Sequence, residues 1–358
     1  MAPALARHWG ALLIFGTAAL IPVLVRDAYF LDSLVLILLW GALSAAWNVA
    51  GGYAGQVSIG HAAFFGIGAY SAALLGARFQ QSPWLGMLIG VALSLVAGAA
   101  IGYLSNRLKG PYFALSTIAF SQVLLIVASR WRGFTSGSEG IPVPFRPGFT
   151  TLGLGHVAWV YLALAVAVLY WGTQVWLEHS RFGYRLAGVR EDEDAAQAFG
   201  IPTRRLKVIA VTASAALTSV GGTLWAQYVG FVDPFYVFSV DLSVRFALNA
   251  IIGGMGTALG PFLGSILITS LETYLRASLS GVQSGFTGIY LIVYGTVLIL
   301  VVRFVPDGLM DDPEDTKSAL RAAYASLAET LEFDNLLVAH GDPVVGGARE
   351  ALREFASA

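Results

Sequence analysis

The chain contains no cysteine and few charged residues, and each shortage excludes a class of protein. Of its 358 residues, 12% are charged and 56% are hydrophobic, and the mean hydropathy is +0.70. Without cysteine there can be no disulfide, thiol nucleophile, iron–sulfur cluster or cysteine-bound zinc. Soluble domains average about 25% charged and about 45–50% apolar residues. The composition therefore predicts a protein embedded in lipid, and it excludes a soluble enzyme or a nucleic-acid-binding protein.

The overall net charge of −1 combines two unlike segments. Residues 311–358 hold 4 basic and 10 acidic residues, which leaves 17 basic and 12 acidic residues for the rest of the chain. A body of net charge +5 thus carries a tail of −6. We expect a transmembrane domain over residues 1–309 and a short soluble, cytoplasmic tail over residues 310–358.

Long apolar runs dominate the body. About 20 mostly apolar residues are needed for a helix to cross a hydrocarbon core of about 30 Å. The eighth and ninth runs are short and interrupted by glycine, which predicts broken or re-entrant segments. The first run also resembles a secretory signal, but the next begins almost at once, so we expect an anchor helix. The sequence predicts an all-α, polytopic inner-membrane bundle of about 8–10 spans, with runs near Trp9–Val25, Tyr29–Ala50, His61–Ala77, Trp84–Ser105, Tyr112–Ser129, His156–Leu177, Leu206–Gly230, Leu242–Ile252, Gly260–Arg276 and Phe286–Phe304.

Basic residues between the spans predict the orientation. The loop 178–207 carries six of them, and Arg107 and Lys109 lie between the fourth and fifth runs. Because loops rich in Lys and Arg stay in the cytoplasm, we expect both loops there. With ten spans, both termini would also be cytoplasmic.

The loop 178–207 reads as a site of partner docking. An acidic first turn, alanine-rich helix formers and Gly200 as a stop predict a short helix at the membrane surface, and Pro202 starts the next element. Its small residues would let it dock in a groove of a partner, although an ordinary solvated loop helix fits the same pattern. The candidate coupling residues are Arg190, Glu191, Asp194, Ala195, Ala196 and Gly200.

Two glycine-rich segments, 48–70 and 247–267, place polar side chains at membrane depth. Irregular backbone there is tolerated only when protein buries it or it lines a water-filled path, and broken spans often mark a solute route. Plain tight turns are the alternative, and the likeness between the two segments is a weak sign of a repeat. His61 has no second ligand nearby, so no metal site is expected. The candidate path residues are Asn48, Gly52, Gln56, Ser58, His61, Asn249 and Gly254.

Ionisable residues within the runs are few, chiefly Asp32, Asp241, Arg245 and Glu272. Glu272 and Arg276 stand four residues apart, which predicts a pair on one helix face. An ion-coupled carrier needs a buried relay and a membrane enzyme needs convergent catalytic groups; the sequence favours neither. It also lacks the phosphate-binding P-loop pattern. We expect a conduit powered by another chain, with no catalytic residue and no cofactor.

Several segments together resemble the branched-chain amino-acid ABC transporter permeases, M-type subunit. They are Asn48–Leu75, Lys109–Thr117, Arg181–Lys207, Gly253–Pro261 and Phe304–Leu309. The resemblance implies a subunit of an ATP-driven importer in the bacterial or archaeal cytoplasmic membrane, with a homologous second permease, two ABC ATPase subunits and an extracytoplasmic solute-binding protein. It implies alternating access for branched-chain, hydrophobic amino acids. Urea and short-amide permeases are closely similar, so the solute stays open between these classes.

The same resemblance implies that the loop 178–207 docks on the ATPase through an EAA-like pattern, in which Asp194 stands at the glutamate position. The tail departs from the family, whose members commonly end soon after the segment matching Phe304–Leu309. Its stretch 333–352 resembles the end of metallo-β-lactamase-fold hydrolases. His340 is a single ligand, so we expect a fusion remnant or a short cytoplasmic appendage, without a metal site.

Overall fold

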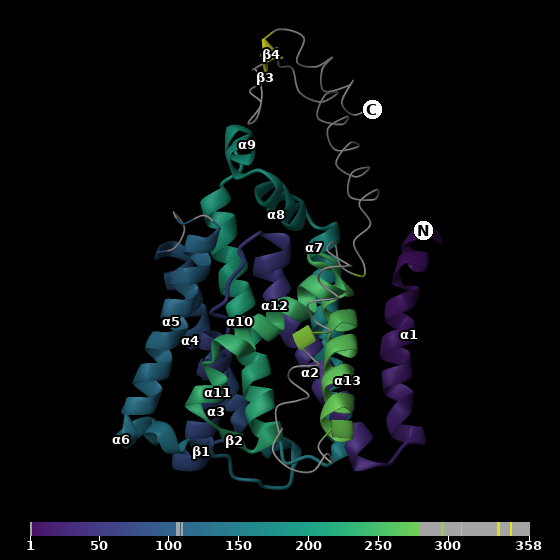
Figure 1. Cartoon of the computed structure of the whole chain (residues 1–358), viewed down its shortest axis with the longest axis vertical. Coiled ribbons are helices and arrows are strands. Elements are labelled where there is room, and N and C mark those ends of the chain that lie inside the picture. The colour runs from purple at the N-terminus through teal and green to yellow at the C-terminus, as the bar shows by residue number, and fades with distance from the viewer. Residues whose placement is uncertain are drawn as a thin grey trace.

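The computed structural model describes residues 2–104, 108, 110–279, 295–296, 309, 335–336 and 344–345, with side chains described outside 2–8, 276–279, 335–336 and 344–345. Helices make up most of this part of the chain (Figure 1). Their bounds are α1 Ala2–Leu24, α2 Ala28–Asn48, α3 Ala62–Phe79, α4 Pro83–Leu104, α5 Pro111–Arg130, α6 Arg132–Thr135, α7 His156–His179, α8 Arg181–Glu191, α9 Glu193–Ala198, α10 Thr203–Val229, α11 Pro234–Val237, α12 Val240–Gly254 and α13 Gly260–Leu279.

Short elements complete the described part. A π-helical turn, η1 Val49–Tyr53, extends α2, and 3₁₀ turns η3 Gly137–Glu139 and η4 Phe149–Thr151 lie between α6 and α7. Strand β1 Ile141–Pro142 pairs antiparallel with β2 Phe231–Val232, so Ile141 faces Val232 and Pro142 faces Phe231. In the tail, β3 Asn335–Leu336 pairs with β4 Val344–Val345.

The predicted all-α membrane bundle is confirmed. Six helices are long and apolar enough to cross a membrane, namely α2 with η1, α3, α4, α5, α7 and α10, and Trp9–Leu24 of α1 is a shorter apolar helix. The eighth and ninth predicted runs are α12 and α13, separated by a turn at residues 255–259. Apart from residues 295–296, the tenth predicted run, Phe286–Phe304, lies outside the described residues, as does His340 of the tail.

Close packing among α3, α4 and α10 forms the tightest part of the bundle. The buried face of α4 carries small residues four apart, at Gly86, Gly90, Ser94 and Gly98. A Cβ on Gly86 would lie 2.5 Å from Ala72 Cα, and one on Gly90 3.0 Å from Gly68 Cα. Lipid tails are as apolar as leucine, so helices in a bilayer associate through such close backbone approach more than through apolar burial. This face explains part of the abundance of glycine.

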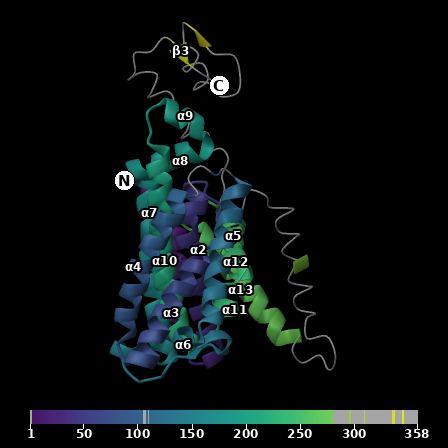
Figure 2. The same cartoon turned by 90° about the vertical axis from the view of Figure 1, so that its left-hand side faces the viewer.

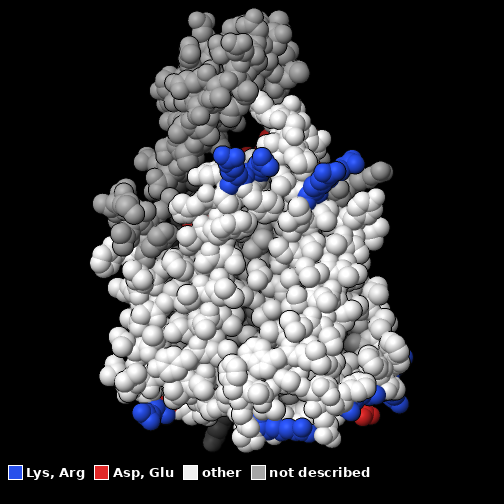
Figure 3. All heavy atoms as spheres, turned by 180° about the vertical axis from the view of Figure 1, so that it is seen from behind, with Lys and Arg blue, Asp and Glu red and all other residues white. Residues whose placement is uncertain are grey.

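The bundle has two distinct ends. Helices α8 and α9 project from one end, and the N-terminus lies at that end too, whereas α6, α11 and the β1–β2 pair lie at the other (Figures 1 and 2). The beginning of α5 lies at the α8 end, as predicted for the two basic loops; Arg107 and Lys109 themselves are outside the described residues. Seen from behind, Lys and Arg gather at both ends and leave a white band between them, as expected for a lipid-facing surface (Figure 3).

Candidate coupling region and transport path

Two short helices, α8 and α9, replace the single helix predicted in the loop 178–207. Ser180 caps α8 by accepting a hydrogen bond from the Gly183 amide at 3.0 Å. Asp192 caps α9 by accepting from the amides of Asp194 and Ala195, each at 2.9 Å. The acidic stretch therefore does not form one first turn, because Asp192 ends one helix and starts the next. Gly200, with φ of +77°, follows α9 as the predicted stop.

This helical hairpin, residues 181–200, packs on the bundle through one apolar face. Leu186, Val189 and Ala196 are buried in a cluster with Tyr53 of η1 and Leu206 of α10. Lys207 donates to Glu193 Oε2 at 2.5 Å, and both side chains are well shielded. The hairpin is thus fixed to the ends of α2 and α10, so a force applied to it would reach both helices.

The opposite face of the hairpin is open. Asp194, Glu191 and Gly200 are exposed and Ala195 is half-buried, whereas Ala196 points into the bundle. Sequence reasoning missed two exposed aromatic residues there, Phe199 at 48% and Tyr184 at 65% exposure. Tyr184 lies within α8 and Phe199 directly follows α9, and only their position outside the buried face distinguishes them from core residues.

Arg190 connects the hairpin to the predicted path. Its Nη1 donates to the Gly52 carbonyl oxygen at 3.0 Å. Its Nε and Nη2 donate to Glu191 Oε1 at 3.0 and 2.8 Å, which orients the guanidinium toward Gly52. A Cβ on Gly55 would lie 3.1 Å from Arg190 Cγ, so the backbone of the glycine-rich segment is packed directly on this side chain. The structure therefore brings one coupling candidate and one path candidate into contact.

Asn48 joins the two glycine-rich segments. Its Nδ2 donates to Gln174 Oε1 at 3.0 Å and to the Thr257 carbonyl oxygen at 3.1 Å. Its Oδ1 accepts from the Gly256 amide at 2.9 Å. A Cβ on Gly52 would lie 1.9 Å from Asn48 Oδ1 and 2.6 Å from the Gly256 nitrogen. Only glycine at position 52 permits this contact between segments 200 residues apart.

The other path candidates are buried and make contacts within the protein. Asn249 donates to Ser44 Oγ at 3.1 Å. His61 Nε2 lies 2.7 Å from Ser214 Oγ, whose single proton goes to the Ala46 carbonyl oxygen, so His61 is the donor of that pair.

The remaining candidates are held mainly by backbone hydrogen bonds, although Ser58 Oγ also accepts one from the Gly60 amide at 3.4 Å. The Ser58 carbonyl oxygen accepts from Trp47 Nε1 at 2.7 Å, the Gln56 amide donates to Ala50, and Gly254 ends α12 with φ of +120°. In this conformation these residues join helices, and their lining of a path stays a prediction.

The contacts of α2 follow a four-residue spacing along one face. Trp40, Ser44, Asn48 and Gly52 contact, in turn, Arg245, Asn249, Gly256 and Arg190. Residues four apart lie above one another on an α-helix, so Trp40, Ser44 and Asn48 follow one face of α2 over about 12 Å. Gly52 of η1 continues this polar column to the hairpin. The sequence singled out Asn48 and Gly52 of this column, but not Trp40, Ser44 or the alignment of the four.

Three of the four ionisable residues that the sequence places in the spans, Asp32, Arg245 and Glu272, form side-chain contacts. Glu272 of α13 accepts a hydrogen bond from Arg245 Nη2 of α12. The side chain of Arg276, the partner predicted for Glu272, lies outside the described residues. Asp32 Oδ1 accepts from Tyr228 at 2.7 Å and lies 2.6 Å from His156 Nδ1. Among the described residues, no group of three or more His, Asp or Glu side chains has metal-site geometry.

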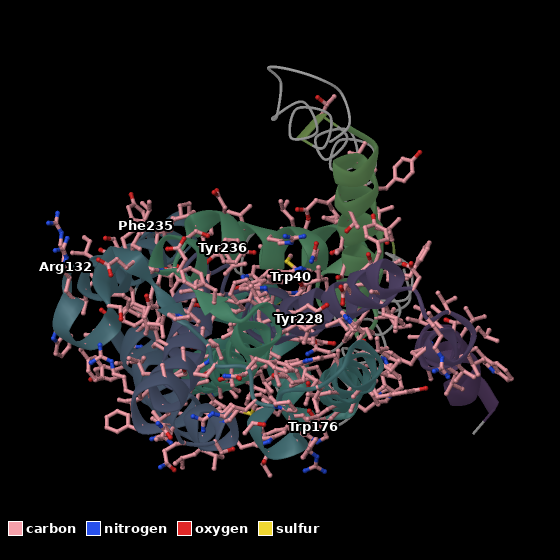
Figure 4. The ribbon with its side chains drawn as sticks, turned by 90° about the horizontal axis from the view of Figure 1, so that it is seen from below. Trp40, Arg132, Trp176, Tyr228, Phe235 and Tyr236 are labelled. Atoms are coloured by element: carbon pink, nitrogen blue, oxygen red, sulfur yellow. The ribbon has the colours of Figure 1, made fainter. Side chains whose placement is uncertain are left out.

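A cavity of about 470 Å³ opens between α2, α10, α11, α12 and α13. Figure 4, viewed from the end opposite α8 and α9, shows Trp40, Tyr228 and Tyr236 gathered in the middle of the bundle, away from Arg132 at its edge. Trp40 and Arg245 at the start of the polar column line this cavity. The column therefore connects an open space in the bundle with the hairpin at the other end.

Comparison with known proteins finds one matching family and relatives that carry a similar description. Residues 29–302 match the family described as branched-chain amino acid transport system / permease component. The chain is 28% identical to the high-affinity branched-chain amino acid transport system permease protein LivM of Escherichia coli K12, over 78% of this chain and 69% of LivM. It is 24% identical to LivH of the same strain, over 78% of this chain and 93% of LivH.

An archaeal relative, the probable branched-chain amino acid transport permease protein LivM of Methanocaldococcus jannaschii, is 22% identical over 79% of this chain and 94% of that protein. No solved structure matches. The family match covers α2 to α13 and hence both glycine-rich segments and the hairpin. This multi-pass protein of the cytoplasmic membrane therefore belongs to the family of permease components of branched-chain amino acid transport systems.

Proposed function

We propose that the chain is one of two permease subunits of an ATP-driven importer of branched-chain amino acids. Two ABC ATPase subunits would supply the energy, and an extracytoplasmic binding protein would deliver the solute. Similarity to both LivM and LivH, two differently named permease proteins, supports a homologous second permease as partner. The observation that carries the proposal is the hairpin, which has an open face for a partner and is tied through Arg190 to the glycine-rich break after α2.

The proposed mechanism is alternating access. When ATP closes the ATPase dimer, the hairpin moves with it, and Arg190 and the Glu193–Lys207 pair pass the motion to the ends of α2 and α10. Packed helices change between discrete arrangements rather than deforming continuously. The two glycine-rich segments, which meet at Gly52 and Gly256, would separate or slide in this step. The path would then open to one side of the membrane at a time.

Uptake into proteoliposomes tests the proposal. The chain would be purified by a tag together with the subunits that accompany it, reconstituted, and supplied with internal ATP and external binding protein. Radiolabelled leucine should accumulate with ATP, and a protonophore should leave the initial rate unchanged. Uptake that needs an ion gradient and ignores ATP would contradict the proposal and favour an ion-coupled carrier.

The same preparation distinguishes the related substrate classes. Excess valine or isoleucine should compete with labelled leucine, whereas urea and acetamide should leave its uptake unchanged. ATP-driven uptake of urea without uptake of leucine would replace the amino-acid assignment by the short-amide alternative.

A further inference from the structure

The cavity between α2, α10, α11, α12 and α13 contains charges of both signs beside aromatic rings. Its volume of about 470 Å³ falls within the range of about 300–1,000 Å³ that is usual for small-molecule sites. The residues that give it its chemistry are Asp32, Trp40, Trp225, Tyr236, Arg245 and Glu272. They come from helices that are distant in sequence, so the cavity depends on the assembled bundle.

Arg245 and Glu272 form an ion pair in its wall. The two side chains are only 20% and 24% exposed. The guanidinium carbon of Arg245 lies 4.6 Å from the ring centroid of Trp40, in cation–π geometry. Arg245 Nε is buried and has no hydrogen-bond partner in the described part of the chain. The guanidinium is therefore held in place but not fully satisfied, which leaves it capacity for another acceptor.

Aromatic side chains supply the apolar part of the lining. Trp225 and Tyr236 stack with ring centroids 4.9 Å apart, and Trp40 lies on the Arg245 side. At the α2 side, Asp32 is held by Tyr228 and His156 and adds a second acid to the lining. An apolar ligand group would contact rings while its charged groups remained at Arg245 and Glu272.

A role confined to joining α12 and α13 explains this arrangement poorly. Removing two charges from water is expensive, and well-packed apolar residues commonly join helices at least as well as a buried ion pair. Ionisable residues within membrane spans are correspondingly rare and usually serve a solute or ion. Here the pair also faces a cavity that is large enough for a small molecule.

We infer that this cavity binds one zwitterionic amino acid with an apolar side chain. The ligand carboxylate accepts hydrogen bonds from Arg245, its ammonium group donates to Glu272, and its aliphatic side chain lies on Trp40 and Trp225. The opposed charges of Arg245 and Glu272 match the opposed charges of a zwitterion, whereas urea or a short amide would match neither. The inference rests on the proposed transport function and adds a substrate site within this chain.

Equilibrium binding tests the inference apart from transport. The co-purified complex, in nanodiscs without nucleotide and without the binding protein, is titrated calorimetrically with leucine, leucinamide and 4-methylpentanoate. Leucinamide lacks the carboxylate and 4-methylpentanoate lacks the ammonium group. The wild type should bind leucine most tightly, because both charged contacts form only with the zwitterion.

The variants separate the two contacts. Arg245→Gln should weaken the binding of leucine by at least about tenfold and leave the binding of leucinamide nearly unchanged. Glu272→Gln should weaken the binding of leucine and of leucinamide and leave the binding of 4-methylpentanoate nearly unchanged. Arg78→Gln is the matched control, since Arg78 donates to the Gly133 carbonyl oxygen at the same end of the bundle, outside this cavity. If Arg245→Gln does not fold, Arg245→Lys should still reduce the preference for leucine over leucinamide.

Two results would overturn the inference. If the wild-type complex imports leucine with ATP but binds the three ligands with equal affinity, the proposed binding site is wrong and the proposed function still stands. If both variants bind all three ligands more weakly by the same factor, the Arg245–Glu272 pair has only a structural role. Absence of ATP-driven uptake, by contrast, would count against the proposed function whatever the titrations show.

Discussion

Arg190 Nη1 donates a hydrogen bond to the carbonyl oxygen of Gly52, 138 residues earlier in the chain. The contact joins the surface hairpin, residues 181–200, to the π-helical turn that ends α2. Hydrogen bonds to charged groups are worth about 1.5–3 kcal/mol. In the proposed mechanism, this bond is where motion of the hairpin reaches the transport path.

Replacing Arg190 should therefore uncouple the transporter. Arg190→Met removes the bond and keeps much of the aliphatic packing on Gly55. We expect ATP-driven leucine uptake to fall at least about tenfold, in line with the loss of one charged hydrogen bond. Basal ATP hydrolysis should persist, but its stimulation by the binding protein should disappear. Arg185→Met, at an exposed position of the same helix, should leave stimulation intact; full stimulation in Arg190→Met would contradict the coupling role.

A methyl group on Gly52 should disrupt the meeting of the glycine-rich segments. The added Cβ would lie 1.9 Å from Asn48 Oδ1 and 2.6 Å from the Gly256 nitrogen. Overpacking of this kind costs about 1–3 kcal/mol or more, so Gly52→Ala should lower the thermal unfolding temperature and abolish uptake. Gly172→Ala is the control, because no heavy atom lies within 4 Å of its Cβ position. Fluorescence-detected size exclusion after heating compares the two, and equal stability would refute the packing argument.

The main elements of the fold could be predicted from the sequence because spans of about 20 apolar residues are a local property. All nine predicted runs within the described residues are helices. The sequence drew attention to both glycine-rich segments because polar and glycine residues are conspicuous at membrane depth, and their lining of a path stays a prediction. The Arg245–Glu272 pair was not predicted, since it depends on how α12 and α13 pack.

The alignment of residues on α2 and η1 with their partners on other helices could not be predicted either. The column Trp40, Ser44, Asn48 and Gly52 has an obvious spacing only after its partners on α12, the following turn and α8 are known. The cavity beside Arg245 likewise requires five elements to come together. Exposed Phe199 was missed because exposure is a property of the folded hairpin, not of the local sequence.

The small-residue face of α4 should tolerate no large side chain. Gly90→Leu would push α4 away from Gly68 and Ser219, which lie 3.0 and 3.1 Å from the Cβ position. Because helix association in lipid depends on such close approach, we expect the variant to be made poorly and to elute as aggregate. Gly16→Leu, on α1 with open space at its Cβ position, should behave as the wild type. A monodisperse Gly90→Leu protein would show that α4 packs differently.

Bulky residues on the hairpin should uncouple transport without unfolding the bundle. Ala195 is half-buried, and Gly200 has φ of +77°, a conformation that L residues rarely adopt. Ala195→Trp would fill the face proposed for docking, and Gly200→Trp would also strain the end of α9. Both variants should reach the membrane in normal amounts, measured by quantitative immunoblot, yet lose leucine uptake. Unchanged uptake in both would contradict the docking assignment.

Phe199 should act as an anchor for the ATPase subunit. It is 48% exposed directly after α9, and buried aromatic side chains commonly contribute about 2 kcal/mol or more to a protein interface. Phe199→Ala should therefore reduce the amount of ATPase retained on the tagged chain after detergent washing, while the yield of the chain itself stays constant. Phe145→Ala removes an aromatic residue that is 73% exposed, in the segment between β1 and η4, and should retain the ATPase fully. If both variants retain it equally, docking uses another part of the hairpin and Phe199 must have a different role.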